Sequence, residues 1–161
     1  MLEQVKDVHR RAGAGASTNE WAHEWLPRHA ARDAFRFLAA LDEEGAVAGF
    51  AYGYTGGRGQ WWTDRVSAAL DEDLRARWLV PPHFEVVELH VRPEGQRRGL
   101  GSRLLDALLD GLPHRQALLS TQVDNAKARP FYEKHGWEVV VPELSFGPGY
   151  APFCVYGKRL R

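Results

Sequence analysis

The hydrophobic pattern of the chain changes abruptly near its middle. Residues 84–91 are mostly apolar, which predicts a buried β-strand. The segment 92–102 is polar and rich in glycine and arginine. Beyond it, leucines recur at the spacing of an amphipathic helix, at Leu104, Leu105, Leu108, Leu109 and Leu112. The pattern therefore predicts a strand, a short basic loop and a helix in direct succession.

The first thirty residues predict two helices. Apolar positions over 2–12 have helical spacing, and Gly13 ends that pattern. Ser17 and Glu20 are spaced like a capping box that opens a second helix. Pro27 falls inside the second pattern, so the helix ends or kinks there.

A hairpin and a further helix precede the central strand. Apolar runs at 35–41 and 46–54 flank a polar turn, which predicts two antiparallel strands. The next helix follows Trp61 and Trp62, with Thr63 as its expected cap. Its apolar positions recur every four residues, at Val66, Leu70 and Leu74.

The last third of the chain predicts three strands and one helix. The strands are expected at 116–122, 137–141 and 153–158, and the helix starts at Asp124 or Asn125. Because a helix joins them, strands 86–91 and 118–121 should run parallel and close together. The order of elements is mixed α/β, and 161 residues are expected to form a single domain over 1–161.

Composition excludes several classes of partner. Lys plus Arg and Asp plus Glu both number 21, so the formal charge is zero, which argues against a nucleic-acid or anionic-membrane binder. Cys154 is the single cysteine, which fits a reducing compartment. The sequence lacks the roughly 20-residue apolar run of a membrane span and the features of a signal peptide, so a cytoplasmic location is expected.

The basic loop has the composition of a phosphate site. Gly99 and Gly101 stand where the predicted helix begins, so main-chain N–H groups there point at an incoming anion. Glycine lets a phosphate approach the backbone closely, and Arg97 and Arg98 add positive charge.

Two segments together resemble one enzyme family. Gln96-Arg97-Arg98-Gly99-Leu100-Gly101 is similar to the Gln/Arg-x-x-Gly-x-Gly/Ala signature of the GNAT acyl-CoA N-acyltransferases. Residues 125–137, with Tyr132-Glu133-Lys134, resemble the second signature of that family. Either signature alone is weak, but both occur here in the family's order. The resemblance implies a mostly antiparallel sheet with helices on both faces and a V-shaped splay between its two parallel central strands.

The resemblance also implies acetyl-CoA as cofactor. The pantetheine arm would lie in the splay, pairing with the strand backbone and with Asn125, and the diphosphate would lie in the loop. Instead of contacting the cofactor, Asn125 could cap the next helix, and Phe131 could be a core residue. The cofactor residues expected are Leu89, His90, Val91, Gln96, Arg97, Arg98, Gly99, Leu100, Gly101, Ser102, Asn125 and Phe131.

Acyl transfer from a thioester to an amine needs a base and an acid. Glu88 interrupts the apolar strand and is expected to accept the amine proton, with a structural ion pair as the alternative. Tyr132 matches the family's tyrosine and is expected to protonate the leaving thiolate, with helix packing as the alternative. His90 could relay a proton or be structural.

The acceptor is the least specified component. Tyr54, Trp61, Trp62 and Tyr150 could line a pocket for a small-molecule or peptide amine, or belong to the core or to a dimer surface. A homodimer is left open. Histidines and cysteine lack standard zinc spacings, so no metal is expected.

Two rival functions remain open from the sequence. A non-catalytic acyl-CoA sensor would keep the loop but turn over no amine. A nucleotide-binding domain is disfavoured because the chain lacks a P-loop motif.

Overall fold

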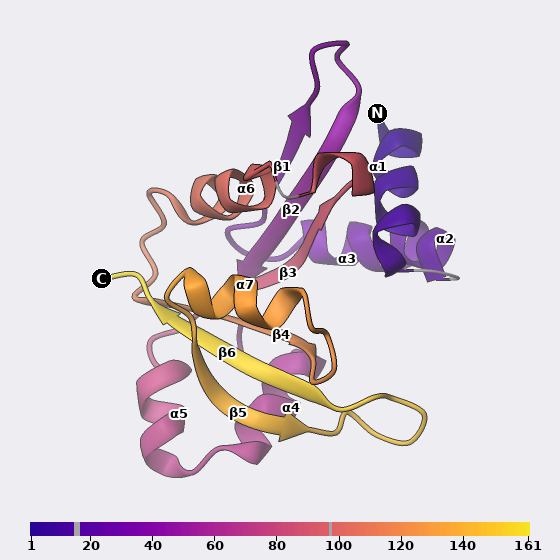
Figure 1. Cartoon of the computed structure of the whole chain (residues 1–161). Helices are drawn as coiled ribbons and strands as arrows, with labels where there is room; N and C mark the ends of the chain where they lie inside the picture. Colours follow the sequence, from indigo (N-terminus) through magenta and orange to yellow (C-terminus); the bar gives the residue numbers. More distant parts are fainter. Residues whose placement is uncertain (15–16, 97) are drawn as a thin grey trace. The chain divides into compact units, whose positions relative to one another are not determined.

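The computed structural model describes residues 1–14, 17–96 and 98–161 (Figure 1). Within these residues six strands are hydrogen-bonded in the order β1-β2-β3-β4-β6-β5. Only β3 and β4 pair in parallel among the pairs described, which confirms the predicted mixed, mostly antiparallel sheet. The chain forms two compact units, Met1–Tyr54 with Val86–Leu112, and Thr55–Glu85 with Pro113–Arg161. The expected single domain stays a prediction.

The first unit begins with several short helical segments. Its parts are α1 (Leu2–His9), the π-helical turn η1 (Arg10–Ala14), α2 (Thr18–Glu20), the π-helical η3 (Trp21–Trp25) and α3 (Leu26–Ala30). Gly13 has φ 102°, so the first helix ends at the predicted glycine. The capping box is not formed, because Ser17 makes no side-chain capping hydrogen bond. Pro27 lies in the first turn of α3, where its missing N–H costs little, and the helix continues to Ala30.

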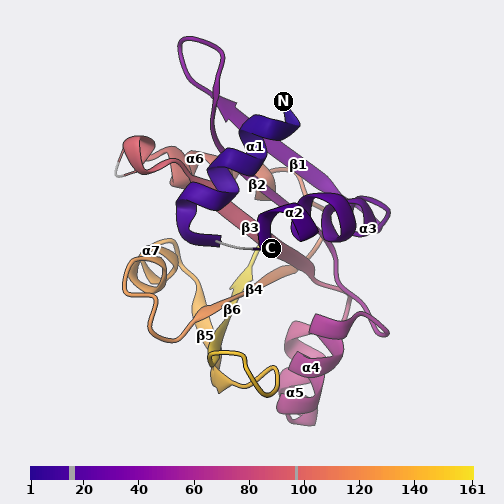
Figure 2. The same ribbon diagram turned by 90° about the vertical axis from the view of Figure 1, so that its right-hand side faces the viewer.

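The strands of this unit have helices on both faces. They are β1 (Arg36–Leu41), β2 (Val47–Thr55) and the later part of β3 (Phe84–Val91), followed by the 3-10 turn η4 (Pro93–Gly95) and α6 (Leu100–Leu109). β1 and β2 form the predicted antiparallel hairpin. Helices α1–α3 cover one face, where Val8, Trp21 and Phe50 are buried together (Figure 2). On the other face α6 packs against β2, since a Cβ on Gly49 would lie 3.1 Å from Leu104 Cδ1.

The second unit has a buried core of its own. Its elements are α4 (Trp61–Ala69), α5 (Glu72–Trp78), the start of β3, β4 (Gln116–Gln122), α7 (Ala128–Lys134), β5 (Glu138–Leu144) and β6 (Phe153–Arg159). β6 pairs antiparallel with both β4 and β5. Val66 and Leu70 pack on Val141 and Val155 on one face.

The predicted parallel pair is formed. β3 and β4 join through Phe84 with Ala117 and Glu85 with Leu118. The splay between the two strands stays a prediction.

Two helix predictions in this unit are wrong. The prediction of one helix after Thr63 is wrong, because the chain forms two helices there, α4 and α5. The backbone is extended at Leu70, and the Asp71 side chain accepts a hydrogen bond from Leu74 N where α5 starts. Thr63 lies inside α4, whose cap is Gln60. α7 begins at Ala128 rather than at residue 124 or 125. Among the described helices, none is both long and apolar enough to cross a membrane.

Candidate active site

The basic loop leads into a helix, as predicted. Gly99 has φ 77° and is the N-cap of α6, with its carbonyl accepting a hydrogen bond from Arg103 N at 3.1 Å. A side chain at this left-handed position would be strained, which explains the glycine. The Gln96 side chain donates to the Val91 carbonyl at 3.1 Å and so ties the loop back to β3. Arg98 is exposed, and Arg97 lies outside the described residues.

The start of α6 has the properties of an anion site. The main-chain N–H groups of Leu100 and Gly101 belong to the first turn of α6, where helix N–H groups point toward the helix start and are available to a ligand. The helix dipole adds partial positive charge at the same end. The ten-residue helix is anchored below by Leu104, Leu105 and Leu108, which are buried. This unit can therefore present a rigid cluster of donors to a phosphate group.

Strand β3 carries the other cofactor residues of this unit. Leu89 and His90 are half-buried and Val91 is buried. The strand is held at its end by β2, since Arg92 N donates to the Ala48 carbonyl at 2.9 Å. A Cβ on Gly49 would lie 2.9 Å from the His90 carbonyl, so the glycine allows the two strands to approach closely.

Glu88 lies between two histidines. Its carboxylate is hydrogen-bonded to His90 Nε2, and its Oε1 lies 3.9 Å from His9 Nε2. Its side chain is 23% exposed. Burial acts to raise the pKa of Glu88, but interactions with His9 and His90 outweigh it and lower the pKa to about 2. The carboxylate is therefore ionised at neutral pH, and the same interactions make it a weaker base than a free glutamate.

His9, the second histidine beside Glu88, was not predicted as a site residue. It comes from α1, its Nδ1 is 2.9 Å from Thr18 Oγ1, and its ring stacks on Trp21 at 4.1 Å between centroids. The available signal was its spacing, because His9 is four residues after Val5 and so shares the apolar face of α1.

Glu85 is a second acidic residue on β3 that was not predicted as a site residue, and it is 4% exposed.

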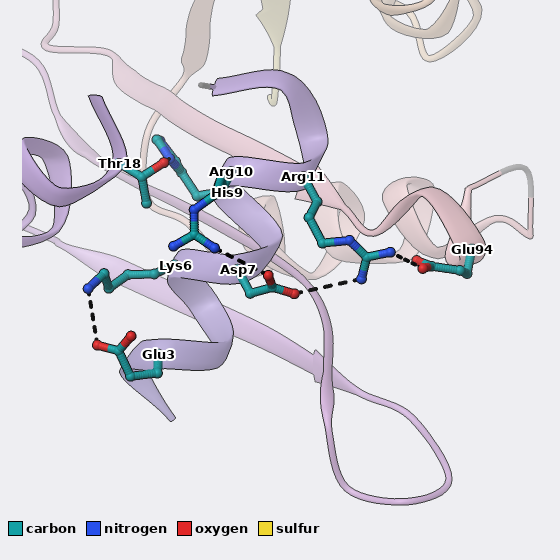
Figure 3. Close-up of polar contacts among 8 residues, drawn as sticks. All are labelled: Glu3, Lys6, Asp7, His9, Arg10, Arg11, Thr18 and Glu94. Atoms are coloured by element: carbon teal, nitrogen blue, oxygen red, sulfur yellow. Dashed lines mark hydrogen bonds and ion pairs between the residues drawn. The ribbon is translucent and has the colours of Figure 1, made fainter. Parts of the chain in front are cut away.

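The N-terminal segment also contacts the region just before the loop. Arg11 forms ion pairs with Asp7 in α1 and with Glu94 in η4 (Figure 3). These side chains are 39%, 47% and 61% exposed, so the pairs contribute little stability. They nevertheless show that the first helix lies against the segment that leads to Gln96.

The remaining cofactor and acid residues belong to the second unit. Asn125 Oδ1 accepts hydrogen bonds from Lys127 N and Ala128 N, at 3.3 and 3.0 Å, so its side chain orders the turn before α7, whose N-cap is Lys127. Tyr132 is half-buried, and its ring lies 5.9 Å from that of Trp137 and 6.1 Å from that of Tyr156. Phe131 is half-buried against His135. The cofactor role of Asn125 and Phe131, and the pairing of Tyr132 with Glu88, stay predictions.

The four aromatic candidates for the acceptor pocket have different environments. Tyr54 is buried, and its hydroxyl accepts a hydrogen bond from Arg32 at 2.5 Å. Trp62 donates to Ser120 Oγ at 3.0 Å and packs against the core of the second unit. Trp61 and Tyr150 are 49% and 59% exposed, with ring centroids 6.2 Å apart. Of the four, these two are the aromatic pair most accessible to a ligand.

Comparison with known proteins gives a consistent result. Residues 2–137 match the family model of the Acetyltransferase (GNAT) family. A GCN5-like protein acetyltransferase of Mycobacterium tuberculosis, Rv2170, is 34% identical over 121 residues, which are 71% of this chain and 59% of that protein. A mycothiol acetyltransferase of Beutenbergia cavernae is 31% identical over 137 residues, which are 78% of this chain and 44% of that protein. The chain thus spans about half the length of these relatives.

A solved structure supports the fold. The crystal structure of the PaiA N-acetyltransferase from Thermoplasma acidophilum in complex with coenzyme A has a TM-score of 0.63 and 18% identity. The match covers 98% of this chain and 92% of that chain. At this identity the likeness concerns the fold alone.

Proposed function

This chain belongs to the GNAT acetyltransferase family, and we propose that it transfers the acetyl group of acetyl-CoA directly to a primary amine. The observation that carries the proposal is that one unit holds the later part of β3, the Gln96 side chain bonded back to Val91, and the start of α6 after Gly99. It combines the end of a strand, a loop tied back by Gln96 and a set of helix N-terminal donors.

The cofactor would be held mainly by backbone groups. The diphosphate of coenzyme A would accept hydrogen bonds from N–H groups of residues 99–102, with Arg98 and Arg97 adding charge. The amides of the pantetheine arm would pair with Leu89, His90 and Val91 in the manner of an added strand. A main-chain N–H at this point of β3 would also polarise the thioester carbonyl.

The reaction would proceed without an acyl-enzyme. The amine nitrogen attacks the thioester carbonyl carbon, a carbon–nitrogen bond forms, and the carbon–sulfur bond breaks. Glu88 accepts the proton lost by the amine, directly or through water, and His90 can relay it because the two side chains are hydrogen-bonded. Tyr132 gives its hydroxyl proton to the departing thiolate of coenzyme A.

The acceptor is a small-molecule or peptide amine. The relatives named above include a protein acetyltransferase and a mycothiol acetyltransferase, which represent both kinds of acceptor. Trp61 and Tyr150 are the residues we assign to acceptor contact, since exposed aromatic rings can hold an apolar or cationic group. The homodimer and the cytoplasmic location stay predictions.

The test is amine-dependent release of coenzyme A thiol from acetyl-CoA across a panel of small-molecule and peptide primary amines. At least one class of amine should support turnover, and Glu88→Gln should lower kcat by about 100-fold or more, the usual effect of losing a general base. The control Glu43→Gln changes an exposed acid of the hairpin turn and should leave kcat unchanged. Coenzyme A binding without turnover of any amine would instead favour an acyl-CoA sensor.

A further inference from the structure

Three potential metal ligands meet on the face of β3 that α1 covers. One ligand atom each from His9, Glu88 and His90 lies within 4.8 Å of the other two. His9 comes from α1, and Glu88 and His90 come from β3, where their spacing of two residues places them on the same face. All three belong to the first unit, so the arrangement depends on contacts within that unit alone.

The His9 ring is held in a fixed orientation. Its Nδ1 lies 2.9 Å from Thr18 Oγ1 in a buried contact, and its ring is nearly parallel to that of Trp21, with 9° between the planes. When Nδ1–H donates to the threonine hydroxyl, the lone pair is on Nε2, the nitrogen that faces Glu88. Metal-binding histidines are typically oriented by such a hydrogen bond on their other nitrogen.

The donor set selects a particular kind of ion. Two imidazoles and one carboxylate are a common ligand set for zinc, whereas Mg²⁺ and Ca²⁺ prefer oxygen ligands. Tetrahedral ligands at about 2.0 Å from zinc lie about 3.3 Å from one another. His9 Nε2 and Glu88 Oε1 are 3.9 Å apart, whereas Glu88 and His90 are hydrogen-bonded to each other, so the ion would replace that hydrogen bond and side-chain rotations would bring the three ligand atoms to equal separations.

We propose that His9, Glu88 and His90 bind a zinc ion. Glu88 and His90 keep 23% and 18% of their side chains exposed, which gives the ion an entry path and leaves its fourth position open to water. His9, only 3% exposed, forms the inner wall of the site. The hydrogen bond between Thr18 Oγ1 and His9 Nδ1 orients His9 as a ligand. An ordinary histidine–glutamate hydrogen bond does not need this third group.

Zinc at this site would inhibit acetyl transfer. The bound ion would occupy the carboxylate of Glu88 and the Nε2 of His90, so neither could accept the amine proton. The inhibition rests on the proposed function, whereas zinc binding rests on the geometry of the three ligands alone. A chelator should therefore restore activity to protein that has been loaded with zinc.

The experiment is calorimetric titration of tag-free protein with zinc chloride. A second titration, with cobalt chloride, follows tetrahedral coordination by visible absorption. Wild-type protein should bind one ion. Loss of a ligand in His9→Gln or Glu88→Gln should weaken zinc binding by about 100-fold or more, and Thr18→Val by about 10-fold. His23→Gln, which changes an exposed histidine of the same unit, should bind as wild type does.

The outcomes separate the two proposals. Each variant is first shown to bind coenzyme A as wild type does, which establishes that it is folded. The absence of saturable zinc binding by folded wild-type protein, or equal zinc affinity in His9→Gln and wild type, would overturn the metal site. Zinc binding by a protein that acetylates no amine would leave the metal site standing and contradict the proposed function alone.

Discussion

His83 gives the most quantitative prediction for stability. It lies immediately before β3 in the second unit and is 1% exposed. Among the described residues, its Nε2 has no hydrogen-bond partner. Burial, with a smaller contribution from His114, lowers the pKa of His83 from 6.5 to about 4. The folded protein therefore holds this imidazole neutral at pH values at which the unfolded chain protonates it.

The sign and size of the effect follow from proton linkage. Because the folded pKa is the lower one, the contribution to stability is complete above pH 6.5 and is lost as the pH falls toward 4. The loss from His83 alone amounts to about 2 kcal/mol at pH 5 and about 3 kcal/mol at pH 4. This is a large fraction of the stability of an ordinary domain.

The assay is urea unfolding at pH 7 and pH 5, followed by tryptophan fluorescence, for wild type and His83→Gln. The variant cannot titrate at this position, so its loss of unfolding free energy between the two pH values should be smaller by about 2 kcal/mol. If His83→Gln does not fold, His83→Leu serves for the same comparison. Equal losses in wild type and variant would refute the assignment of a buried neutral histidine.

Two further substitutions test packing and the proposed acid. Gly157→Ala should lower the free energy of unfolding by about 1–3 kcal/mol, because its Cβ would lie 2.5 Å from the buried Trp78 ring. The control Gly57→Ala should change the free energy of unfolding by less than about 1 kcal/mol. Equal effects of the two substitutions in urea unfolding would contradict this packing. Tyr132→Phe keeps the aromatic ring and should lower kcat by about 100-fold without changing coenzyme A affinity; unchanged kcat would rule out the acid role.

Local pattern was enough to predict most of the sheet. The spans predicted at 84–91 and 116–122 agree with β3 and β4, because each contains a short apolar run, Val86–Val87 and Ala117–Leu119. Helix ends were predicted less well. Leu70 and Leu74 share a helical spacing, yet the chain is extended at Leu70 and restarts at Asp71, since a capping aspartate competes with helix continuation.

The candidate site was predictable only where it is continuous in sequence. The loop at 96–102 and Glu88 with His90 stand out in the linear pattern. His9 does not, because its meeting with Glu88 depends on how α1 packs against β3, and spacing rules for metal sites consider only neighbours in sequence. A polar residue on the apolar face of α1 was the one sequence signal for it.

The central claim is that the turn and helix start at residues 96–102 bind the diphosphate of coenzyme A. The most direct measurement is a crystal structure of the complex with acetyl-CoA. We predict diphosphate oxygens about 3 Å from main-chain nitrogens of residues 99–102, with the thioester beside Leu89–Val91. A diphosphate bound away from the start of α6 would contradict it.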